Sequence, residues 1–449
     1  QRSRKQPPLP EFLVEGIDLV PHSGGISRVL EGDYEGMKVF VRHVLPGEVA
    51  RIQVTKLKGG YGEGRVLDLI EQAPRRVASD CSISEECGAC SWRHVPLKEQ
   101  SEARAGFSRN AVQRVWPEED FDFELRAPAV TFRSRVRFLL SRQGLAYRSF
   151  RSRVPAVPER CPALHPDIEA SREALGAWLL ALGLEGASVL IVRGQTKPGG
   201  QWKLFVSVFT ERNRDVDPQG VPEEISGSLS LGGIRIQDRK GGVRWALGES
   251  VFYWPMTLSG RELALQFPLG SFTQSSPEGN QVLVSSVAEV FSELGHAPIE
   301  ALELFAGSGN LSVAWPQSLG RLTVVERDGS ALSGLEKNLG SPRPFPVSLV
   351  EGDLSGGLVN LMKAQEGDFD VVLLDPPREG ALAMMDDLVR LEIPQIVYVS
   401  CDPATLSRDL RVLHKGGYKP SRVVAVELFE ATPHVETLVV LGLMPENGK

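Results

Sequence analysis

The strongest constraint in the sequence is a regular alternation of helical and strand patterns from Gly270 to the end of the chain. Short apolar runs rich in β-branched residues, typical of buried strands, alternate there with stretches of helical pattern. Alternation of this kind predicts an α/β fold with a parallel, doubly wound sheet, whose strand ends gather the ligand-binding residues. The helix is expected at 277–294 and the strands at 299–305, 321–325, 346–350, 369–374, 395–399, 423–428 and 437–443.

Length and composition favour a soluble globular protein of two or three domains. The chain has 449 residues, of which 42% are hydrophobic and 24% are charged. No apolar run approaches the roughly 20 residues of a membrane helix. The basic, proline-rich segment Gln1–Pro10 lacks an apolar core, so we expect a tail rather than a signal peptide, and a cytoplasmic protein. Nothing in the sequence demands more than a monomer.

Ahead of the alternating region, the pattern is mostly of strands. Residues 12–72 show short strands punctuated by glycine turns, which predicts a five-stranded barrel of the oligonucleotide-binding kind. The same segment holds seven Lys and Arg against nine Asp and Glu, so its composition leaves RNA binding and a structural spacer both open. A helix at 97–116 and short strands from 123 to 269 follow. We therefore expect domains at 1–72, 73–269 and 270–449.

The five cysteines divide into a set of four and one that stands alone. Cys81, Cys87 and Cys90 lie within ten residues, and Cys161 follows 71 residues after Cys90. Four thiolates suit zinc or a 4Fe-4S cluster. The wide first gap and the proline after Cys161 favour iron–sulfur, in a structural or RNA-positioning role.

A strip rich in arginine, residues 132–160, follows the cysteine segment. It contains eight arginines and one acid, Glu159. On a strand, Arg133, Arg135 and Arg137 would share one face, and Arg151 and Arg153 would do the same. Interleaved aromatic residues such as Phe132 could stack on bases, so the strip favours RNA phosphate contact over a merely solvated face.

A nucleotide-binding pattern follows the first strand of the predicted sheet, in the segment from Glu303 to Asn310. Gly307 and Gly309 would allow a tight turn and close approach of a ligand to backbone amides, although a plain turn has the same pattern. Glu326 ends the next strand, 17 residues after Gly309, where an acid can bind ribose hydroxyls. Two glycines without a phosphate-binding lysine favour adenosine without a pyrophosphate, as in S-adenosylmethionine.

Polar residues also follow the later strands. Asp353 and Asp375 come after the third and fourth strands, and Cys401 comes after the fifth. Pro403 suits the first turn of a helix, so Cys401 is expected where a strand gives way to a helix. Free cysteines are often buried small hydrophobes. Polar groups at several strand ends instead favour a functional edge.

Together these motifs resemble those of S-adenosylmethionine-dependent RNA 5-methyluridine methyltransferases. The resemblance is strongest to the 23S ribosomal RNA branch, which carries a TRAM domain and a 4Fe-4S cluster, and it extends from about Phe12 to Leu443. The motifs that carry it are the four cysteines, Phe132-Arg133-Ser134-Arg135, Phe272-Thr273-Gln274, Glu303–Asn310, Asp375–Arg378, Ser400–Asp409 and His434-Val435-Glu436.

The resemblance implies a fold and a role for each motif. It implies a TRAM-like RNA-binding barrel, a β-rich iron–sulfur domain with an RNA-binding strip, and a Rossmann-like class I methyltransferase domain. Cys401 would be the nucleophile and Glu436 the general base. S-adenosylmethionine would be bound by Gln274, Phe305, Gly307, Gly309, Asn310, Glu326, Asp353 and Asp375. The cluster would be held by Cys81, Cys87, Cys90 and Cys161. RNA would contact Phe132, Arg133 and Arg135.

The residue types also fit this chemistry without the resemblance. Carbon 5 of uracil is a poor nucleophile until a thiolate adds to carbon 6, and a base must then remove the proton from carbon 5. The expected substrate is a uridine in 23S ribosomal RNA, with transfer RNA as an alternative. Two other hypotheses are an amino-group methyltransferase, because Asp375-Pro376-Pro377-Arg378 resembles the acid-Pro-Pro-aromatic motif, and a non-catalytic cluster-bearing RNA-binding protein.

Overall fold

The computed structural model describes residues 9–22, 24–211, 231–238, 241–294, 299–340, 343–358 and 368–444, so most of the expected N-terminal tail lies outside the described residues. The chain divides into two compact units. The first unit consists of Gln1–Phe107, Arg148–Arg160 and Glu430–His434, and the second consists of Ser108–Tyr147, Cys161–Phe429 and Val435–Lys449. The domain boundaries expected after residues 72 and 269 stay a prediction.

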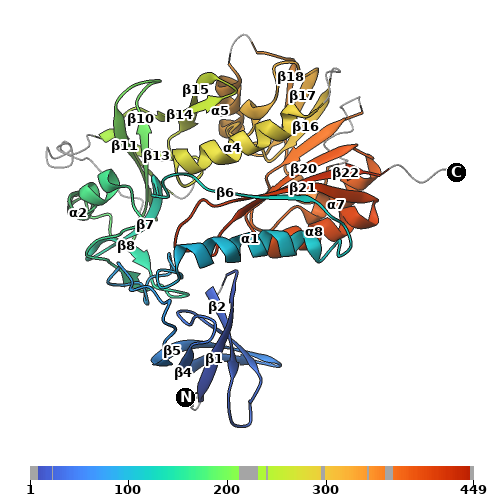
Figure 1. The fold of residues 1–449 in the computed structure, drawn as a ribbon. Helices are drawn as coiled ribbons and strands as arrows, with labels where there is room; N and C mark the ends of the chain where they lie inside the picture. Colours follow the sequence, from blue (N-terminus) through green and yellow to red (C-terminus); the bar gives the residue numbers. More distant parts are fainter. Residues whose placement is uncertain are drawn as a thin grey trace, which may run out of the picture. The chain divides into compact units, whose positions relative to one another are not determined.

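The first unit contains a closed barrel of five strands in the order β1-β2-β3-β5-β4 (Figure 1). Its strands are β1 (Glu11–Val20), β2 (Gly24–Val29), β3 (Lys38–Val41), β4 (Val49–Lys58) and β5 (Tyr61–Glu71). Alternate strand residues are buried, among them Val14 and Ile52. A Cβ atom on Gly16 would lie 2.1 Å from the carbonyl oxygen of Leu45, so only glycine fits there. The predicted five-stranded barrel is confirmed.

Trp92 attaches the segment with three of the cysteines to this barrel. Its side chain is fully buried among Leu19, Leu45 and Ala73. The indole Nε1 of Trp92 donates a hydrogen bond to the carbonyl oxygen of Gly24 at 2.8 Å, which satisfies the only polar atom of the buried ring. The first unit also contains the short strand β9 (Pro155–Ala156) and the first part of helix α1 (Leu97–Gln113).

The second unit contains two sheets. The strands of the first are β7 (Arg135–Ser141), β8 (Gly144–Arg148), β10 (Ser188–Gln195), β11 (Trp202–Thr210), β12 (Leu231–Asp238), β13 (Val243–Gly248), β14 (Val251–Leu258) and β15 (Arg261–Pro268). Their order is β13-β12-β11-β10-β7-β8, and the hairpin of β14 and β15 joins at β10. The segments 198–200 and 241–242 lie between antiparallel partners, the first between β10 and β11 and the second between β12 and β13. Helix α2 (Pro166–Ala181) also belongs to this unit.

The second sheet has eight strands in the order β18-β17-β16-β19-β20-β22-β21-β6. Its strands are β6 (Asp122–Arg126), β16 (Glu300–Leu304), β17 (Arg321–Glu326), β18 (Val347–Glu351), β19 (Val371–Leu374), β20 (Gln395–Ser400), β21 (Tyr418–Val426) and β22 (Glu436–Leu443). Strands β16 to β20 pair in parallel, whereas β22 runs antiparallel to both of its neighbours. The expected parallel sheet is therefore confirmed for five strands. The strands expected at 423–428 and 437–443 are present as β21 and β22, and the edge strand β6 is an addition.

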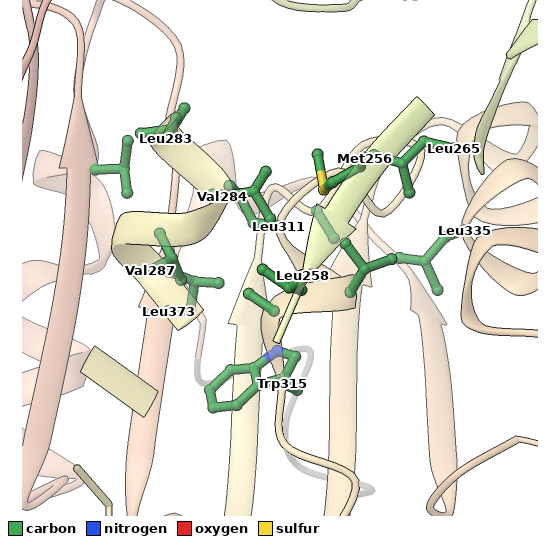
Figure 2. Close-up of a cluster of buried hydrophobic side chains, with 14 of the residues drawn as sticks. Met256, Leu258, Leu265, Leu283, Val284, Val287, Leu311, Trp315, Leu335 and Leu373 are labelled. Carbon is green, nitrogen blue, oxygen red and sulfur yellow. The ribbon is translucent and has the colours of Figure 1, made fainter. Parts of the chain in front are cut away.

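Helices cover both faces of this eight-stranded sheet. They are α4 (Pro277–Ser292), α5 (Gly329–Leu339), α7 (Leu382–Arg390), α8 (Pro403–Lys415) and the 3-10 turns η1 (Ser312–Ala314) and η2 (Leu354–Gly356). Alternate residues of β19 face opposite layers, Leu373 toward the core with α4 and α5 and Leu374 toward the core with α7 and α8. Figure 2 shows the first core, in which Val284 of α4 and Leu335 of α5 flank Leu258 and Trp315.

The second core also contains the C-terminal end of α1 and the turn after it. Trp116 is 2% exposed, and its Nε1 donates to the carbonyl oxygen of Tyr418 on β21 at 3.1 Å. Ala111 and Val112 of α1 pack in the same cluster. A helix from the N-terminal quarter of the chain thus packs in the layer over β21.

We expect Trp116→Ala to lower the free energy of unfolding by about 3–5 kcal/mol, because it removes a large buried side chain and leaves the Tyr418 carbonyl without its donor. Chemical denaturation followed by circular dichroism measures this change. Leu382→Ala is the control, since Leu382 is 44% exposed and its truncation should cost less than about 0.5 kcal/mol. Equal losses for the two variants would contradict the anchoring role of Trp116.

Candidate active site

The pairing of β20 with β22 places Cys401 and Glu436 at one edge of the eight-stranded sheet. Ser400, the last residue of β20, pairs with Thr437 of β22, so the residues beyond this pair are Cys401 on one strand and Glu436 on the other. Asp375 follows the neighbouring strand β19, whose Leu374 pairs with Tyr398 of β20. Three strands therefore bring a thiol and two carboxyl groups to the same edge, as the sequence predicts for Cys401 and Asp375.

Cys401 lies immediately before helix α8. The Asp402 side chain caps this helix by accepting hydrogen bonds from the backbone amides of Ala404 at 2.9 Å and Thr405 at 3.0 Å, and Pro403 is its first residue. Burial raises the pKa of the Cys401 thiol to about 12, and the carboxylates of Glu436, Asp375 and Asp402 add to the rise. The thiol is therefore protonated in the free protein at neutral pH.

The two carboxyl groups are also tuned by burial. Burial raises the pKa of Glu436 to about 8, with a further contribution from Asp375, and it raises the pKa of Asp375 to about 7. The guanidinium of Arg378 acts in the opposite direction and lowers the pKa values of Glu436 and Cys401. A carboxyl with a pKa near neutrality can accept and release a proton in a catalytic cycle, so Glu436 has the properties of a general base.

The loop after β16 has the backbone geometry expected of a nucleotide-binding turn. Phe305 has φ 62°, Gly307 has φ 55° and Gly309 has φ 80°. A Cβ atom on Gly309 would lie 3.0 Å from the Cα of Leu335, so the loop packs closely on α5. The amide of Gly307 donates to Glu326 Oε2 at 3.0 Å, which joins the loop to the end of β17. The structure therefore brings Phe305, both glycines and Glu326 together.

Asn310, in the same loop, is held by a partner that the sequence did not single out. The amides of Asn310 and Asn280 of α4 donate to each other at 2.7 Å in both directions, and Asn280 is 1% exposed. Glu303, the first residue of the nucleotide-binding segment, is fully buried and accepts hydrogen bonds from Ser312 Oγ and Trp315 Nε1, both at 2.8 Å. Burial raises the pKa of Glu303 to about 7. The hydrogen bonds of Asn280 and Glu303 therefore hold the loop after β16 in place.

The other two residues predicted to bind the cofactor lie on flanking loops. Gln274 is buried just before α4, and Asp353 is an exposed cap of η2 that accepts from the amide of Ser355 at 2.9 Å. The amide of Ser355 is also the main cause of a lowered Asp353 pKa, which keeps this side chain ionised. These features fit a nucleoside that carries a positive charge. There is open space beside Gly307, Glu326 can bind ribose hydroxyls, and Glu436 and Asp375 supply acids at the edge.

The strip residues Phe132, Arg133 and Arg135 lie beside the Gln274 loop. The backbone amides of Ser134 and Arg135 both donate to the carbonyl oxygen of Ser275, at 2.8 and 3.0 Å. The guanidinium of Arg133 lies 5.4 Å from the ring centroid of Phe429, and that of Arg135 lies 5.2 Å from the ring of Phe272, which is 71% exposed. Cations over aromatic rings, one of which is exposed, form a surface that suits a nucleic acid.

Two predictions about this strip need correction. Arg135 and Arg137 do share a face of β7, but Arg133 precedes the strand in an isolated bridge to Leu164. Arg151 and Arg153 do not lie on a strand, because Arg151 has φ 51° in a turn. The alternation rule fails at both places because local turns interrupt the extended backbone.

The cysteines predicted to hold a cluster have different surroundings. In the first unit, Cys87 and Cys90 are buried, and Arg42 donates to their carbonyl oxygens at 3.0 and 3.3 Å. Burial alone would lower the pKa of Arg93, but the Cys90 thiol and Asp80 outweigh it and raise that pKa. Cys81 is partly exposed. Cys161, in the second unit, is buried with its Sγ 3.4 Å from the Tyr147 hydroxyl.

These surroundings fit thiolate ligands only in part. Buried sulfurs, nearby guanidinium groups and the amide of Ala89 directed at Cys87 Sγ at 3.4 Å suit an anionic cluster. Among the residues that the structure describes, however, no three His, Cys, Asp or Glu side chains are gathered closely enough to hold a metal ion. The chemistry of the donors is therefore appropriate, while their gathering into one site is not shown.

Two family models match parts of the chain. The TRAM domain matches residues 13–67, and the family tRNA (Uracil-5-)-methyltransferase matches residues 359–443. The second match includes Asp375, Cys401 and Glu436. Among the described residues, no helix is long and apolar enough to cross a membrane.

Relatives align over nearly the whole chain. The 23S rRNA (uracil(1939)-C(5))-methyltransferase RlmD of Aeromonas salmonicida is 28% identical, with 98% of each chain covered. The protein of the same name from Nitrosococcus oceani is 27% identical, with 97% of each covered. The solved structure of Pyrococcus abyssi tRNA (uracil-54, C5)-methyltransferase in complex with S-adenosyl-L-homocysteine has a TM-score of 0.68 at 19% identity, covering 95% of this chain and 100% of that one.

The structural likeness shows a class I methyltransferase fold, and the barrel at the N-terminus is a TRAM domain. The matched families, the full-length relatives and the thiol–carboxyl edge agree with one another. Over nearly its whole length, the chain is therefore similar to RNA (uracil-5-)-methyltransferases.

Proposed function

We propose that this protein methylates carbon 5 of a uridine in 23S ribosomal RNA through a covalent adduct with Cys401. The observation that carries the proposal is the register of β20 and β22, which sets a thiol beside a carboxyl group with a pKa near neutrality. The relatives named for 23S rRNA align with almost the whole chain, including the TRAM domain. We infer that the protein acts as a monomer.

The residues at the edge would act in a fixed order. The Cys401 thiolate adds to carbon 6 of the uracil, and the electron pair of the carbon 5–carbon 6 double bond moves to form an enolate. When bound, S-adenosylmethionine supplies the methyl group that carbon 5 receives. Glu436 then removes the proton from carbon 5, the double bond forms again and the carbon–sulfur bond breaks. Cys401 must first lose its own proton, and Arg378 is the nearby cation that favours this loss.

The cofactor would lie along the loop after β16. Glu326 would accept hydrogen bonds from the ribose hydroxyls, and Phe305, Gly307, Gly309 and Asn310 would line the nucleoside. The carboxyl groups of Asp353 and Asp375 and the side-chain amide of Gln274 would complete the cofactor site at this edge of the sheet. Opposite charge favours a sulfonium beside the buried acid Asp375.

We also propose that Cys81, Cys87, Cys90 and Cys161 bind a 4Fe-4S cluster. The supporting observations are the burial of three of the sulfurs and the two guanidinium groups near Cys90. The cluster would join distant segments of the chain rather than take part in methyl transfer, because four protein ligands leave no iron open to substrate.

Transfer RNA is the alternative substrate, favoured by the name of the family that matches residues 359–443. Mapping 5-methyluridine in ribosomal and transfer RNA from cells with and without the gene separates the two. Methyladenosine as the product would instead support an amino-group methyltransferase. Full function after loss of Cys401 would support a non-catalytic RNA-binding protein.

The order of steps separates the two catalytic residues. We expect Cys401→Ala to abolish both methylation and the covalent protein–RNA species. Glu436→Gln should still allow attack and methyl transfer but then stall, because a general base contributes about 10²–10⁴ in rate. Denaturing electrophoresis with labelled S-adenosylmethionine should show a protein–RNA adduct that contains the methyl group. Normal turnover of Glu436→Gln would instead make Asp375 the candidate base.

Iron content tests the cluster. Protein purified without oxygen should be brown, with broad visible absorbance and iron and sulfide in equal amounts. We expect Cys161→Ser to lose the colour and to destabilise the chain, because a remote ligand ties two segments together. The control is Cys401→Ser, which removes a cysteine outside the set and should keep the iron. Colourless wild-type protein with stoichiometric zinc would contradict the assignment.

Salt dependence tests the strip. Arg133→Ala and Arg135→Ala should each weaken RNA binding and reduce the salt slope by about one, while the affinity for S-adenosylmethionine stays unchanged. The control is Arg114→Ala, which removes an exposed arginine outside the strip. Fluorescence anisotropy with an oligoribonucleotide at several salt concentrations measures both quantities. If the two strip variants behave like the control, the strip is only a solvated surface and does not bind RNA.

A further inference from the structure

The turn Pro377–Ala381 after β19 is bound through its backbone by three side chains of α8. Thr405 Oγ1 donates to the carbonyl oxygen of Arg378 at 3.1 Å. Arg408 Nη2 donates to the carbonyl oxygen of Glu379 at 2.7 Å. Asp409 Oδ2 accepts from the backbone amide of Ala381 at 2.7 Å. Because these contacts are made to the backbone, they fix the position of the turn whatever its side chains do.

The turn and the helix are also packed too closely for any residue but glycine at position 380. Gly380 has φ 75°. A Cβ atom there would lie 2.5 Å from Asp409 Oδ2 and 3.1 Å from the Cβ of Thr405. Because the packing is this close, the turn can take only one position relative to α8.

Asp409 is itself held rigidly. It is 0% exposed, and its carboxylate accepts from the Tyr398 hydroxyl at 2.8 Å and from Arg408 Nε at 2.8 Å. Burial raises the pKa of Tyr398, so this phenol stays a donor. One buried carboxylate therefore joins β20, α8 and the turn, and the same strand and helix flank Cys401.

The turn carries the cation that acts on the nucleophile. Four charged groups surround Cys401: Asp375 at the end of β19, Arg378 in the turn, Asp402 at the start of α8 and Glu436 on β22. The three acids disfavour the thiolate, and among the described residues Arg378 is the cation that favours it. The interaction between two charges depends on their separation, so movement of the turn changes the reactivity of the thiol.

We propose that Thr405, Arg408 and Asp409 form a positioning clamp that holds Arg378 beside Cys401 and thereby sets the reactivity of the nucleophile. The proposal rests on the proposed function of Cys401. It gives these three residues a positioning role in the reaction, through Arg378.

Thr405 offers the sharpest test, because it can be changed without a change of volume. Thr405→Val removes the hydroxyl at nearly constant shape, and Thr405→Ser keeps it. The measurement is the rate at which iodoacetamide alkylates Cys401 as a function of pH, followed by mass spectrometry of the peptide in the full-length protein without RNA or cofactor. Arg411→Ala, on the exposed side of α8, is the matched control.

We expect the alkylation profile of Thr405→Val to move to higher pH, because a displaced Arg378 stabilises the thiolate less. Below the thiol pKa a shift of one unit is a tenfold loss of rate at fixed pH, and a shift of about that size is expected. Thr405→Ser should restore the wild-type profile, and Arg411→Ala should not differ from wild type. Asp409→Asn, which weakens the acceptor for Ala381, should shift the profile in the same direction.

Turnover gives the second measurement. Thr405→Val should form the protein–RNA adduct about tenfold more slowly, with an unchanged KM for RNA and unchanged affinity for S-adenosylmethionine. An unshifted alkylation profile in both Thr405→Val and Asp409→Asn overturns the clamp. A lower melting temperature without a shifted profile also overturns it, since the contacts would then be only structural.

The alkylation test separates this proposal from the proposed function. It needs neither RNA nor methyl transfer, so a shifted profile supports the clamp even in a protein that does not methylate uridine. Failure of wild-type protein to form an adduct with RNA counts against the proposed function and leaves the alkylation result to decide the clamp.

Discussion

The candidate site depends on the antiparallel pairing of β22 with β20. Because β22 runs against its neighbours, its first residue lies at the edge where the parallel strands end, and Glu436 comes next to Cys401. A shift of one residue in this register would turn Glu436 to the opposite face of the sheet. Thr437 opposes such a shift, since its buried hydroxyl lies 2.8 Å from that of Ser108 on α1. A helix far away in sequence thus supports the register of β20 and β22.

The electrostatics of the edge follow from burying acids with little positive charge around them. The pKa values of Glu303 and Asp375 rise to about 7 and that of Glu436 to about 8, so the folded chain binds protons that the unfolded chain would release above pH 4.5. Stability from these groups is therefore present at low pH and falls as pH rises toward 8. Acids placed in this way disfavour a thiolate at Cys401 and favour a bound cation. The protonation state of the Cys401 thiol would therefore depend on whether a cation is bound.

The sequence predicted the helices and strands that have a regular hydrophobic periodicity, and the polar residues that follow the ends of strands. Both signals are local, which is why the barrel, five parallel strands and the positions of Cys401, Asp375 and Glu326 agree with the structure. It did not predict that β6 joins the eight-stranded sheet, because the pairing of β6 with β21 joins segments about 300 residues apart in the chain. The roles of Asn280 and Glu303 were missed for a related reason, since each acts on the loop after β16 through a tertiary hydrogen bond that no periodicity records.

The length of the motif around Cys401 has a physical explanation in the helix that follows it. A strand end alone would need only Ser400 to Asp402, yet the motif continues through α8 to Asp409. Thr405, Arg408 and Asp409 are spaced by three and four residues, so they lie on one face of the helix, and that face contacts the turn with Arg378. The residues that follow Cys401 therefore hold the turn that carries its neighbouring charge, and a helix is the element that can present three such side chains from one short segment.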